Sequence, residues 1–392
     1  MMIERQATKA AIRLAEQFPV IAITGPRQSG KTTLAKAAFP DKKYVTFDDK
    51  KMRNIAESAP EDFLKAFPNG AIIDEAQKVP DIFDAIKLVV DKEKYTPGKF
   101  ILTGSSQFRL KENITDSLAG RIGLINLLPF SIEELKNAGL LSDEPYDYAF
   151  GGFYPPLYDS ERNYLASDWF ENYIDTYLDL DVKEWINPSN IRQFRKLLQL
   201  CAATSGQTVN YEWYSNRLDV SAVTVKSWLS ILEASFIIHF LEPDYNNFTK
   251  SITKTPKLYF VDTGLMCHLL RLEAKEELLI DDHKGAVVET MAVAELMKSR
   301  LNNGRKANLS FFRNKNGLEV DVIADWKEAL AIEIKSSSNA DNRFSSGLKK
   351  YLALHETSPK GFIFYLGDLT CKISDINYIS WKDWGMAEAL LK

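Results

Sequence analysis

Hydrophobic positions in the first third of the chain fall into short apolar runs separated by longer amphipathic stretches. The apolar runs occupy residues 19–24, 43–47, 70–74, 99–103 and 122–128. In the stretches between them, apolar residues recur at three- and four-residue spacing, as in residues 31–39, 61–67 and 81–94. The runs predict strands and the stretches predict helices, so we expect βαβ crossovers and a largely parallel sheet.

This alternation ends at residues 151–160, which read "GGFYPPLYDS" and are rich in Gly, Pro and Tyr. Beyond them the pattern is helical, and residues 211–243 read as a helix, a short turn, a second helix and a strand, which resembles a winged helix-turn-helix. A last unit has a helix over 285–299 and a hairpin near 318–336. We therefore divide the chain into residues 1–150, 151–270 and 271–392.

Composition narrows the class of protein. The 392 residues suffice for two or three domains, and 45% hydrophobic with 26% charged residues is ordinary for a globular protein. A net charge of −4 argues against a chain permanently coated with nucleic acid, although a local basic patch stays open. The widely spaced Cys201, Cys267 and Cys371 predict neither a disulfide framework nor a zinc cluster. With no signal peptide and no long apolar window, we expect a cytoplasmic protein without membrane contact.

The stretch "GPRQSGKT", residues 25–32, matches the phosphate-loop pattern G-x-x-x-x-G-K-[ST] between a predicted strand and a predicted helix. Such a loop turns its backbone N–H groups onto phosphate oxygens at the positive end of the helix. Lys31 would reach the β- and γ-phosphates, and the Thr32 hydroxyl would bind Mg²⁺. We therefore predict ATP as the ligand, held by Gly25, Pro26, Arg27, Gln28, Ser29, Gly30, Lys31, Thr32 and Thr33.

Two adjacent carboxylates favour hydrolysis over transfer to a second substrate. In "AIIDEAQ", residues 71–77, an apolar strand ends in Asp74 and is followed directly by Glu75. Asp74 would hold the Mg²⁺ shell, and Glu75 would orient and polarise the attacking water as a general base. A solvated strand end is the alternative interpretation of this pair.

Two further positions could respond to the γ-phosphate. Ser105, after the predicted strand in "ILTGSSQF", could act as a sensor of nucleotide state, although a Ser pair after Gly is also a common loop. Arg121 in "SLAGRIG" could stabilise transition-state charge from its own or a neighbouring subunit of a homo-oligomer, or could be a simple surface residue.

These motifs carry a resemblance that covers almost the whole chain. "GPRQSGKTTLA", "IIDEAQKVP", "ILTGSSQF", "LAGRIGLINLLPFSIEEL", "KLYFVDTGL", "VVETMAVAEL" and "EVDVIADWKEALAIEIKSS" occur in the order seen in a large group of prokaryotic AAA-type ATPases. That group joins the ATPase to a C-terminal domain of unknown function related to restriction endonucleases. The resemblance implies that Gly25–Thr32, Asp74, Glu75 and the Ser105 region correspond to Walker and sensor motifs. It also strengthens Arg121 as an arginine-finger candidate.

A second group of charged residues lies in the predicted C-terminal hairpin. In "AIEIK", Glu333 and Lys335 point to one face of a strand. If the turn is centred on Lys327, antiparallel pairing sets Asp321 opposite Glu333, because each lies six residues from that centre. Glu289, on the apolar stripe of the preceding helix, is expected to face inward toward them.

Carboxylates beside a lysine can hold a divalent metal and position a water against a phosphodiester. The arrangement resembles the D-x(n)-E-x-K core of restriction-type nucleases, with Val320 where the best-known pattern has Pro. Glu289, Asp321 and Glu333 would bind a second divalent metal, and Lys335 would stabilise developing charge. An active nuclease, a retained but inactive nuclease-like fold and an unrelated surface hairpin all stay open.

The middle region could contact DNA. The second helix of its helix-turn-helix offers Lys226 and Ser227 on a polar side, and basic stretches follow at 247–257 and 298–317. A lid or linker on the ATPase is the alternative role. We expect an α/β protein with a P-loop AAA-type core, a winged-helix middle and a restriction-endonuclease-like end. Its expected activity is Mg²⁺-dependent ATP hydrolysis coupled to a nucleic-acid-directed or nuclease-like domain. The alternative is a nucleotide-dependent switch or scaffold whose last domain binds a protein partner.

Overall fold

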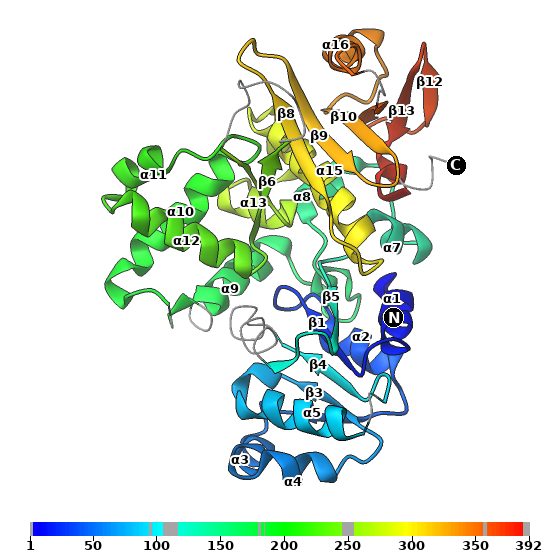
Figure 1. Ribbon diagram of the computed structural model, residues 1–392. Coiled ribbons are helices and arrows are strands. Elements are labelled where there is room, and N and C mark those ends of the chain that lie inside the picture. The colour runs from blue at the N-terminus through cyan, green and yellow to red at the C-terminus, as the bar shows by residue number, and fades with distance from the viewer. Residues whose placement is uncertain are drawn as a thin grey trace.

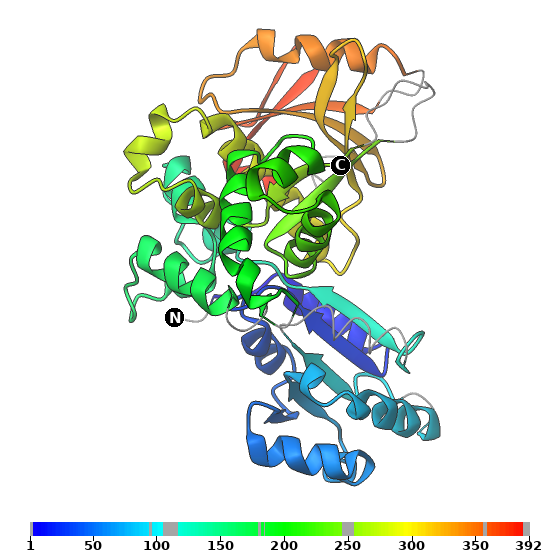
Figure 2. The same cartoon turned by 90° about the vertical axis from the view of Figure 1, so that its left-hand side faces the viewer.

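The computed structural model describes residues 3–93, 96–104, 117–178, 182–183, 185–244, 255–355 and 359–386. Two β-sheets organise these residues. Figure 1 shows the first sheet and its helices in blue and cyan at one end of the molecule, and the second sheet in yellow to red at the other. In the turned view of Figure 2 the green helices of the middle region lie beside the second sheet and above the first.

The first sheet is wholly parallel in the described residues, with five strands in the order β2-β3-β4-β1-β5. The strands are β1 (Val20–Thr24), β2 (Lys43–Thr46), β3 (Ala71–Asp74), β4 (Phe100–Thr103) and β5 (Ile122–Asn126). Every residue of β1, β3 and β4 is buried, as expected of strands covered on both faces. The five predicted strands and the parallel α/β sheet are therefore confirmed.

Helices cover both faces of this sheet. One face packs against α1 (Ala7–Ala15) and α2 (Lys31–Ala38) through Ile21 and Ile23. The other packs against α3 (Lys50–Ser58), α4 (Pro60–Lys65) and α5 (Asp81–Lys92) through Val20 and Ala22. Successive side chains of β1 thus point to opposite faces, which explains why its sequence is an uninterrupted apolar run.

The chain that follows the first sheet is mainly helical. Two helices precede residue 152, α7 (Ile132–Asn137) and α8 (Pro145–Gly151), and the middle region adds α9 (Ala166–Tyr177), α10 (Ile191–Ala203), α11 (Tyr211–Leu218) and α12 (Ala222–Ala234). Asp219, in the left-handed region at φ 55°, ends α11, and the Ser221 side chain caps α12 by accepting from the Thr224 N–H at 3.0 Å. The antiparallel strands β6 (Ile238–Pro243) and β7 (Lys257–Phe260) follow, so the predicted order of helix, turn, helix and strand is confirmed.

The second sheet joins the middle region to the C-terminal region. Its order in the described residues is β12-β13-β11-β10-β9-β8-β6-β7. The C-terminal strands are β8 (Leu309–Arg313), β9 (Glu319–Asp325), β10 (Ala329–Lys335), β11 (Lys360–Tyr365), β12 (Cys371–Ile373) and β13 (Ile376–Ser380). A single apolar core runs from Leu128 to Trp384, so residues on either side of position 270 share a sheet and a core.

Helix α15 (Lys284–Leu301) contributes many buried residues to this shared core, to which α13 (Thr263–Leu269) and α14 (Lys275–Ile280) also belong. Helix α16 (Ser346–Leu352) packs in a separate apolar cluster with β8, β9, β10 and β11. Helix α15 packs against β10 and β7 and against the short helix at Trp381–Met386. In Figure 1 it runs beneath the second sheet toward α7. Among the described residues, no helix combines the length and the apolar character needed to cross a bilayer.

Candidate functional site

The phosphate loop connects the carboxyl end of β1 to the first turn of α2 and depends on two glycines. Gly25 adopts φ +148°, and a Cβ atom there would lie 2.1 Å from the carbonyl oxygen of Leu127. Gly30, with φ +90°, is the left-handed N-cap of α2. A larger residue at Gly25 would collide with the segment that follows β5, so the motif's first glycine is required by close packing as well as by the turn.

The inner surface of the loop fits a phosphate chain. The Lys31 ammonium is buried and donates to the carbonyl oxygens of Gly25 at 3.1 Å and Pro26 at 2.7 Å. The buried hydroxyl of Ser29 has no hydrogen-bond partner among the described residues. These donors lie at the positive end of α2, where a phosphate group supplies the acceptors that they need.

Thr32 and Asp74 form the side of the site suited to a metal. The Thr32 hydroxyl lies 3.2 and 3.1 Å from the two carboxylate oxygens of Asp74, and Tyr44 donates to the same carboxylate at 2.8 Å. Thr103 donates to it as well. Burial, followed by the hydrogen bond to Asp74, raises the pKa of Tyr44 to about 12, so this phenol stays a donor. The carboxylate is thereby fixed where Mg²⁺ would be shared with Thr32 and phosphate oxygens.

Glu75 leaves the line of β3 at φ 54° and accepts from Gln77 Nε2 at 2.5 Å. It lines the same cavity as Lys31 and Thr32, whose volume is about 1010 Å³. Lys31, Thr32 and Glu75 thus line one cavity, and Asp74 adjoins it through its hydrogen bond with Thr32. Tyr44 and Gln77, which hold the two carboxylates, have no sequence signal of their own.

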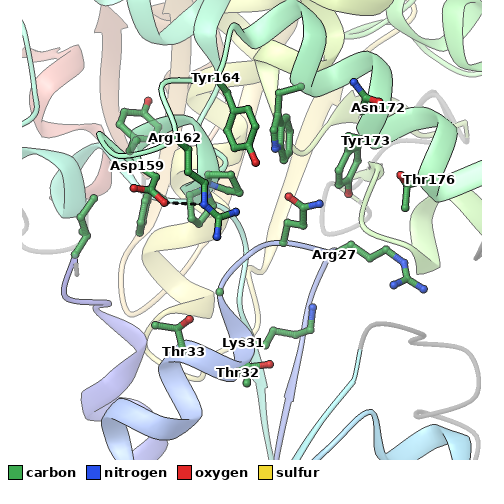
Figure 3. Close-up of a pocket in the computed structure, with 18 of the residues that line it drawn as sticks. Arg27, Lys31, Thr32, Thr33, Asp159, Arg162, Tyr164, Asn172, Tyr173 and Thr176 are labelled. Atoms are coloured by element: carbon green, nitrogen blue, oxygen red, sulfur yellow. Dashed lines mark ion pairs between the residues drawn. The ribbon is translucent and has the colours of Figure 1, made fainter. Parts of the chain in front are cut away.

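The opposite wall of the cavity comes from the middle region. Figure 3 shows Arg162, Tyr164 and Tyr173 across the cavity from Arg27 and Lys31. The wall residues belong to the Pro155–Tyr158 turn, to α9 and to the chain between them: Pro155, Pro156, Tyr158, Asp159, Arg162, Tyr164, Asp168, Trp169, Asn172, Tyr173 and Thr176. Sequence reasoning treated this Gly-, Pro- and Tyr-rich stretch as a boundary and missed its place in the site.

Two predicted residues are not brought to this cavity. Ser105 lies outside the described residues. Arg121 directly precedes β5, at the amino end of the parallel strands, whereas the phosphate loop follows their carboxyl end. Its guanidinium pairs with Asp91 at 2.6 and 2.8 Å. An action of Arg121 on its own chain's nucleotide does not fit this position, and an action on a neighbouring subunit stays a prediction.

In the C-terminal hairpin the pairing of β9 with β10 has the predicted register. It runs from Ala329 opposite Asp325 to Ile332 opposite Val322, so it is centred on Lys327. Asp321 Oδ2 accepts from the Ile334 N–H at 2.8 Å, and Lys335 Nζ lies 2.9 Å from Glu333 Oε2. Burial, followed by the charge of Asp321, raises the pKa of Glu333 to about 8. These side chains therefore gather on one face, as expected.

Glu289 faces inward from α15 and brings in residues that sequence reasoning missed. Its carboxylate accepts from the Tyr259 hydroxyl at 2.5 Å and lies 3.3 Å from Lys257 Nζ. Lys257 is also 2.6 Å from Glu319. Burial, followed by the charge of Asp321, raises the pKa of Glu289. Over the described ranges, no three acidic, His or Cys side chains stand close enough together to hold a metal ion.

The helix-turn-helix exposes few charges. On α12 the side chains of Lys226, Ser227 and Ser230 are exposed, whereas Thr224 is half-buried against Ser221. Most of the basic stretch 247–257 lies outside the described residues.

Three family models match successive parts of the chain. Residues 17–136 match the family model described as "AAA domain". Residues 142–276 and 284–384 match two models, each described as a domain of unknown function, DUF8612 and DUF4143. The uncharacterized proteins Mb2031c of Mycobacterium bovis and Rv2008c of Mycobacterium tuberculosis are each 28% identical to this chain over 341 residues. The aligned region covers 86% of this chain and 75% of each relative.

Among solved structures, a Walker-type ATPase of Pyrococcus abyssi is 14% identical, with 68% of this chain and 96% of that chain covered and a TM-score of 0.45. The RuvB Holliday junction branch migration motor of Thermotoga maritima is 17% identical, with 60% and 89% covered and a TM-score of 0.30.

Residues 17–136 thus match the AAA domain family, and they carry a phosphate-loop motif on a parallel α/β sheet. The C-terminal match carries no stated function. The restriction-endonuclease-like character of residues 271–392 therefore stays a prediction.

Proposed function

We propose that this protein is a Mg²⁺-dependent ATPase whose nucleotide cycle acts on its C-terminal region. The observation that carries the proposal is the meeting of Lys31, Thr32 and Glu75 around one cavity, with Asp74 hydrogen-bonded to Thr32. In the proposed reaction Lys31 moves from the carbonyl oxygens of Gly25 and Pro26 to the phosphates. Mg²⁺, held by Thr32 and by Asp74, supplies charge neutralisation on the phosphates.

Glu75 is the proposed general base. Its carboxylate lines the cavity and is oriented by Gln77. A general base needs such a fixed position to accept a proton from a water held in line with the γ-phosphate. A kinase would need a second substrate hydroxyl at this place. The strand-end pair of Asp74 and Glu75 therefore favours water as the acceptor.

Substitution of Lys31 tests the nucleotide site. Lys31→Ala removes the ammonium that neutralises the phosphates, and we expect ATP binding and phosphate release to be lost. Lys65→Ala is the matched control, because Lys65 is exposed and paired with Asp62 on α4. Unchanged ATP affinity in Lys31→Ala would reject the proposed site.

For the C-terminal region we propose a nucleic-acid-directed, nuclease-like role. The supporting observation is the gathering of Glu289, Asp321, Glu333 and Lys335. Burial, followed by the charge of Asp321, raises the pKa of both glutamates, and carboxylate oxygens suit Mg²⁺ or Mn²⁺. These carboxylates are of the type that binds a divalent metal, but in the described residues they do not stand close enough to hold one, so a bound metal would have to draw them together. Lys335 would stabilise charge on a phosphodiester.

The two roles left open for this region differ in a direct assay. Plasmid, single-stranded DNA and RNA are incubated with the protein in Mg²⁺ or Mn²⁺, with and without ATP. Cleavage that is lost in Lys335→Ala but kept in Lys360→Ala, an exposed lysine of β11, would support a nuclease. Absence of both cleavage and stimulation of the ATPase by any nucleic acid would support the alternative, a nucleotide-dependent switch or scaffold that binds a protein partner.

A further inference from the structure

Arg5 is a buried arginine that contacts the phosphate loop but is not one of the residues of the loop motif. It precedes α1 and is 6% exposed. Its Nη1 donates to the carbonyl oxygen of Ser29 at 2.6 Å and its Nη2 to that of Leu128 at 2.6 Å. Its Nε donates to Glu134 at 3.0 Å, and its guanidinium lies 4.9 Å from the centre of the Phe130 ring. The planar fork of arginine can make these bonds at fixed angles.

The bond to Ser29 bears on phosphate binding because of the geometry of the peptide unit. In a trans peptide the carbonyl of Ser29 and the N–H of Gly30 point in opposite directions. Because Arg5 holds the Ser29 carbonyl, it fixes the plane of this peptide and with it the direction of the Gly30 N–H. Gly30 itself has φ +90°, a backbone conformation that glycine adopts readily and that other residues rarely adopt. Arg5 thus stabilises the orientation of one of the loop's N–H groups.

The partner of Arg5 belongs to the first turn of α7. Glu134 Oε1 accepts from Arg5 Nε and from the Gln6 N–H at 2.8 Å, and its Oε2 accepts from the Ser131 N–H at 2.9 Å. Ser131 in turn accepts from the Glu134 N–H, which completes a capping box. The guanidinium is therefore bonded at once to the phosphate loop and to the cap of α7.

The same first turn of α7 is bonded to α15. The Ile132 N–H donates to Glu295 at 2.8 Å, and Lys298 donates to Glu295 at 2.8 Å and to the carbonyl oxygen of Phe130 at 2.8 Å. The side chains of Glu295 and Lys298 are fully buried. Asn302, at the end of α15, donates to Gln6 at 3.1 Å. Buried and part-buried polar bonds, together with the backbone of residues 131–132, thus connect the phosphate loop to the helix that carries Glu289.

We propose that Arg5 is a positioning residue of the nucleotide site, which orients the phosphate loop and links its occupancy to helix α15. The inference rests on the proposed ATP site. In this proposal, binding of phosphate changes the conformation of the loop, and the Arg5 guanidinium follows the Ser29 carbonyl. The cap of α7 and the end of α15 move with it, because they are bonded to the guanidinium and to the segment that carries its carboxylate partner. Nucleotide state is thereby sensed at the C-terminal carboxylates without direct contact.

Nucleotide affinity tests the positioning role. Arg5→Met removes the guanidinium and keeps most of the side-chain volume, and we expect ATP affinity to fall about tenfold, as for the loss of one strong hydrogen bond. Arg5→Lys keeps the positive charge but not the forked guanidinium, and its ATP affinity should lie between those of the wild type and Arg5→Met. The control is Arg13→Met on the adjacent helix α1, because Arg13 donates only to the Asn303 carbonyl in the described contacts, at 3.0 Å. A measured fall in affinity that matches the unfolded fraction of Arg5→Met would reject the positioning role.

Amide hydrogen exchange tests the coupling between the phosphate loop and α15, because an arginine with a merely structural role would not transmit nucleotide binding to that helix. With saturating ATP, the amides of residues 131–137 and 293–302 should exchange differently than without ATP, and Arg5→Lys and Glu134→Gln should remove that difference. An unchanged exchange of both segments in wild-type protein that does bind ATP would overturn the inference alone. Absence of ATP binding by the wild type, with Lys31→Ala indistinguishable from it, would reject the proposed function instead.

Discussion

The hydroxyl oxygen of Thr32 lies 3.1 Å from a carboxylate oxygen of Asp74, although the first residue begins a helix and the second ends a strand 42 positions away. The parallel sheet creates this neighbourhood, because the carboxyl ends of β1 and β3 lie along one edge. Every polar group around Asp74 named above donates to it, so its carboxylate is held in one orientation before any metal arrives. This pair is the proposed Mg²⁺ position.

Removal of the Thr32 hydroxyl should weaken the use of Mg²⁺. Thr32→Val keeps the shape of the side chain, so the fold should be unaffected while the metal loses a ligand. We expect kcat to fall at least about tenfold, which corresponds to about 1.4 kcal/mol of barrier. Phosphate release measured over a Mg²⁺ titration checks this, and a variant with the wild-type Mg²⁺ dependence would remove Thr32 from the metal site.

Arg121 should be dispensable for ATP binding within one chain. It lies at the amino end of β5 and is paired with Asp91, away from the phosphate loop. Arg121→Ala is therefore expected to bind ATP with the wild-type affinity. Equilibrium binding at protein concentrations where the chain is monomeric tests this directly. A tenfold loss of affinity under those conditions would show that Arg121 reaches its own nucleotide.

Lys257 should be essential for the stability of the second sheet. Its buried ammonium is the shared partner of Glu289 and Glu319, so Lys257→Met leaves carboxylates without their cation. Breaking a buried ion pair from one side costs about 3 kcal/mol or more. Urea unfolding measures the change. Lys360→Met, which removes an exposed pair with Glu328, should cost less than about 1 kcal/mol. Equal effects of the two substitutions would contradict this prediction.

His239 on β6 should lower the free energy of unfolding in mild acid. Burial lowers its pKa from 6.5 to about 4, so the folded protein keeps the imidazole neutral. Below pH 6.5 the unfolded chain takes up this proton first, and the contribution to the free energy of unfolding is lost as the pH falls toward 4. His239→Gln should show a shallower decline between pH 6.5 and 4 in denaturant titrations. Parallel declines for both proteins would show that His239 is not the group responsible.

The features that the sequence predicts well are those written in local patterns. Fully buried strands such as β1 and β3 require continuous apolar runs, and the phosphate loop requires glycines at fixed spacing. The register of β9 and β10 follows from one turn centred on Lys327, because residues equidistant from a turn must pair. These constraints act within a few residues of each other, so a single sequence displays them.

The features that the sequence does not predict depend on contacts between distant segments. Arg5 meets Ser29 and Glu134 only because the segment before α1 lies against both the phosphate loop and the first turn of α7, and Lys257 meets Glu289 only because β7 joins the second sheet. The wall formed by α9 has no local pattern that distinguishes it from a linker. For Arg121 the motif was visible, but its place at the amino edge of the sheet was not.

The rate of phosphate release from MgATP, compared between wild type and Glu75→Gln, tests the central claim most directly. The amide keeps the shape of the side chain but cannot accept the proton of the attacking water. We predict that the wild type hydrolyses ATP, and that Glu75→Gln binds ATP with similar affinity and retains it unhydrolysed. Hydrolysis by Glu75→Gln at the wild-type rate would contradict the account.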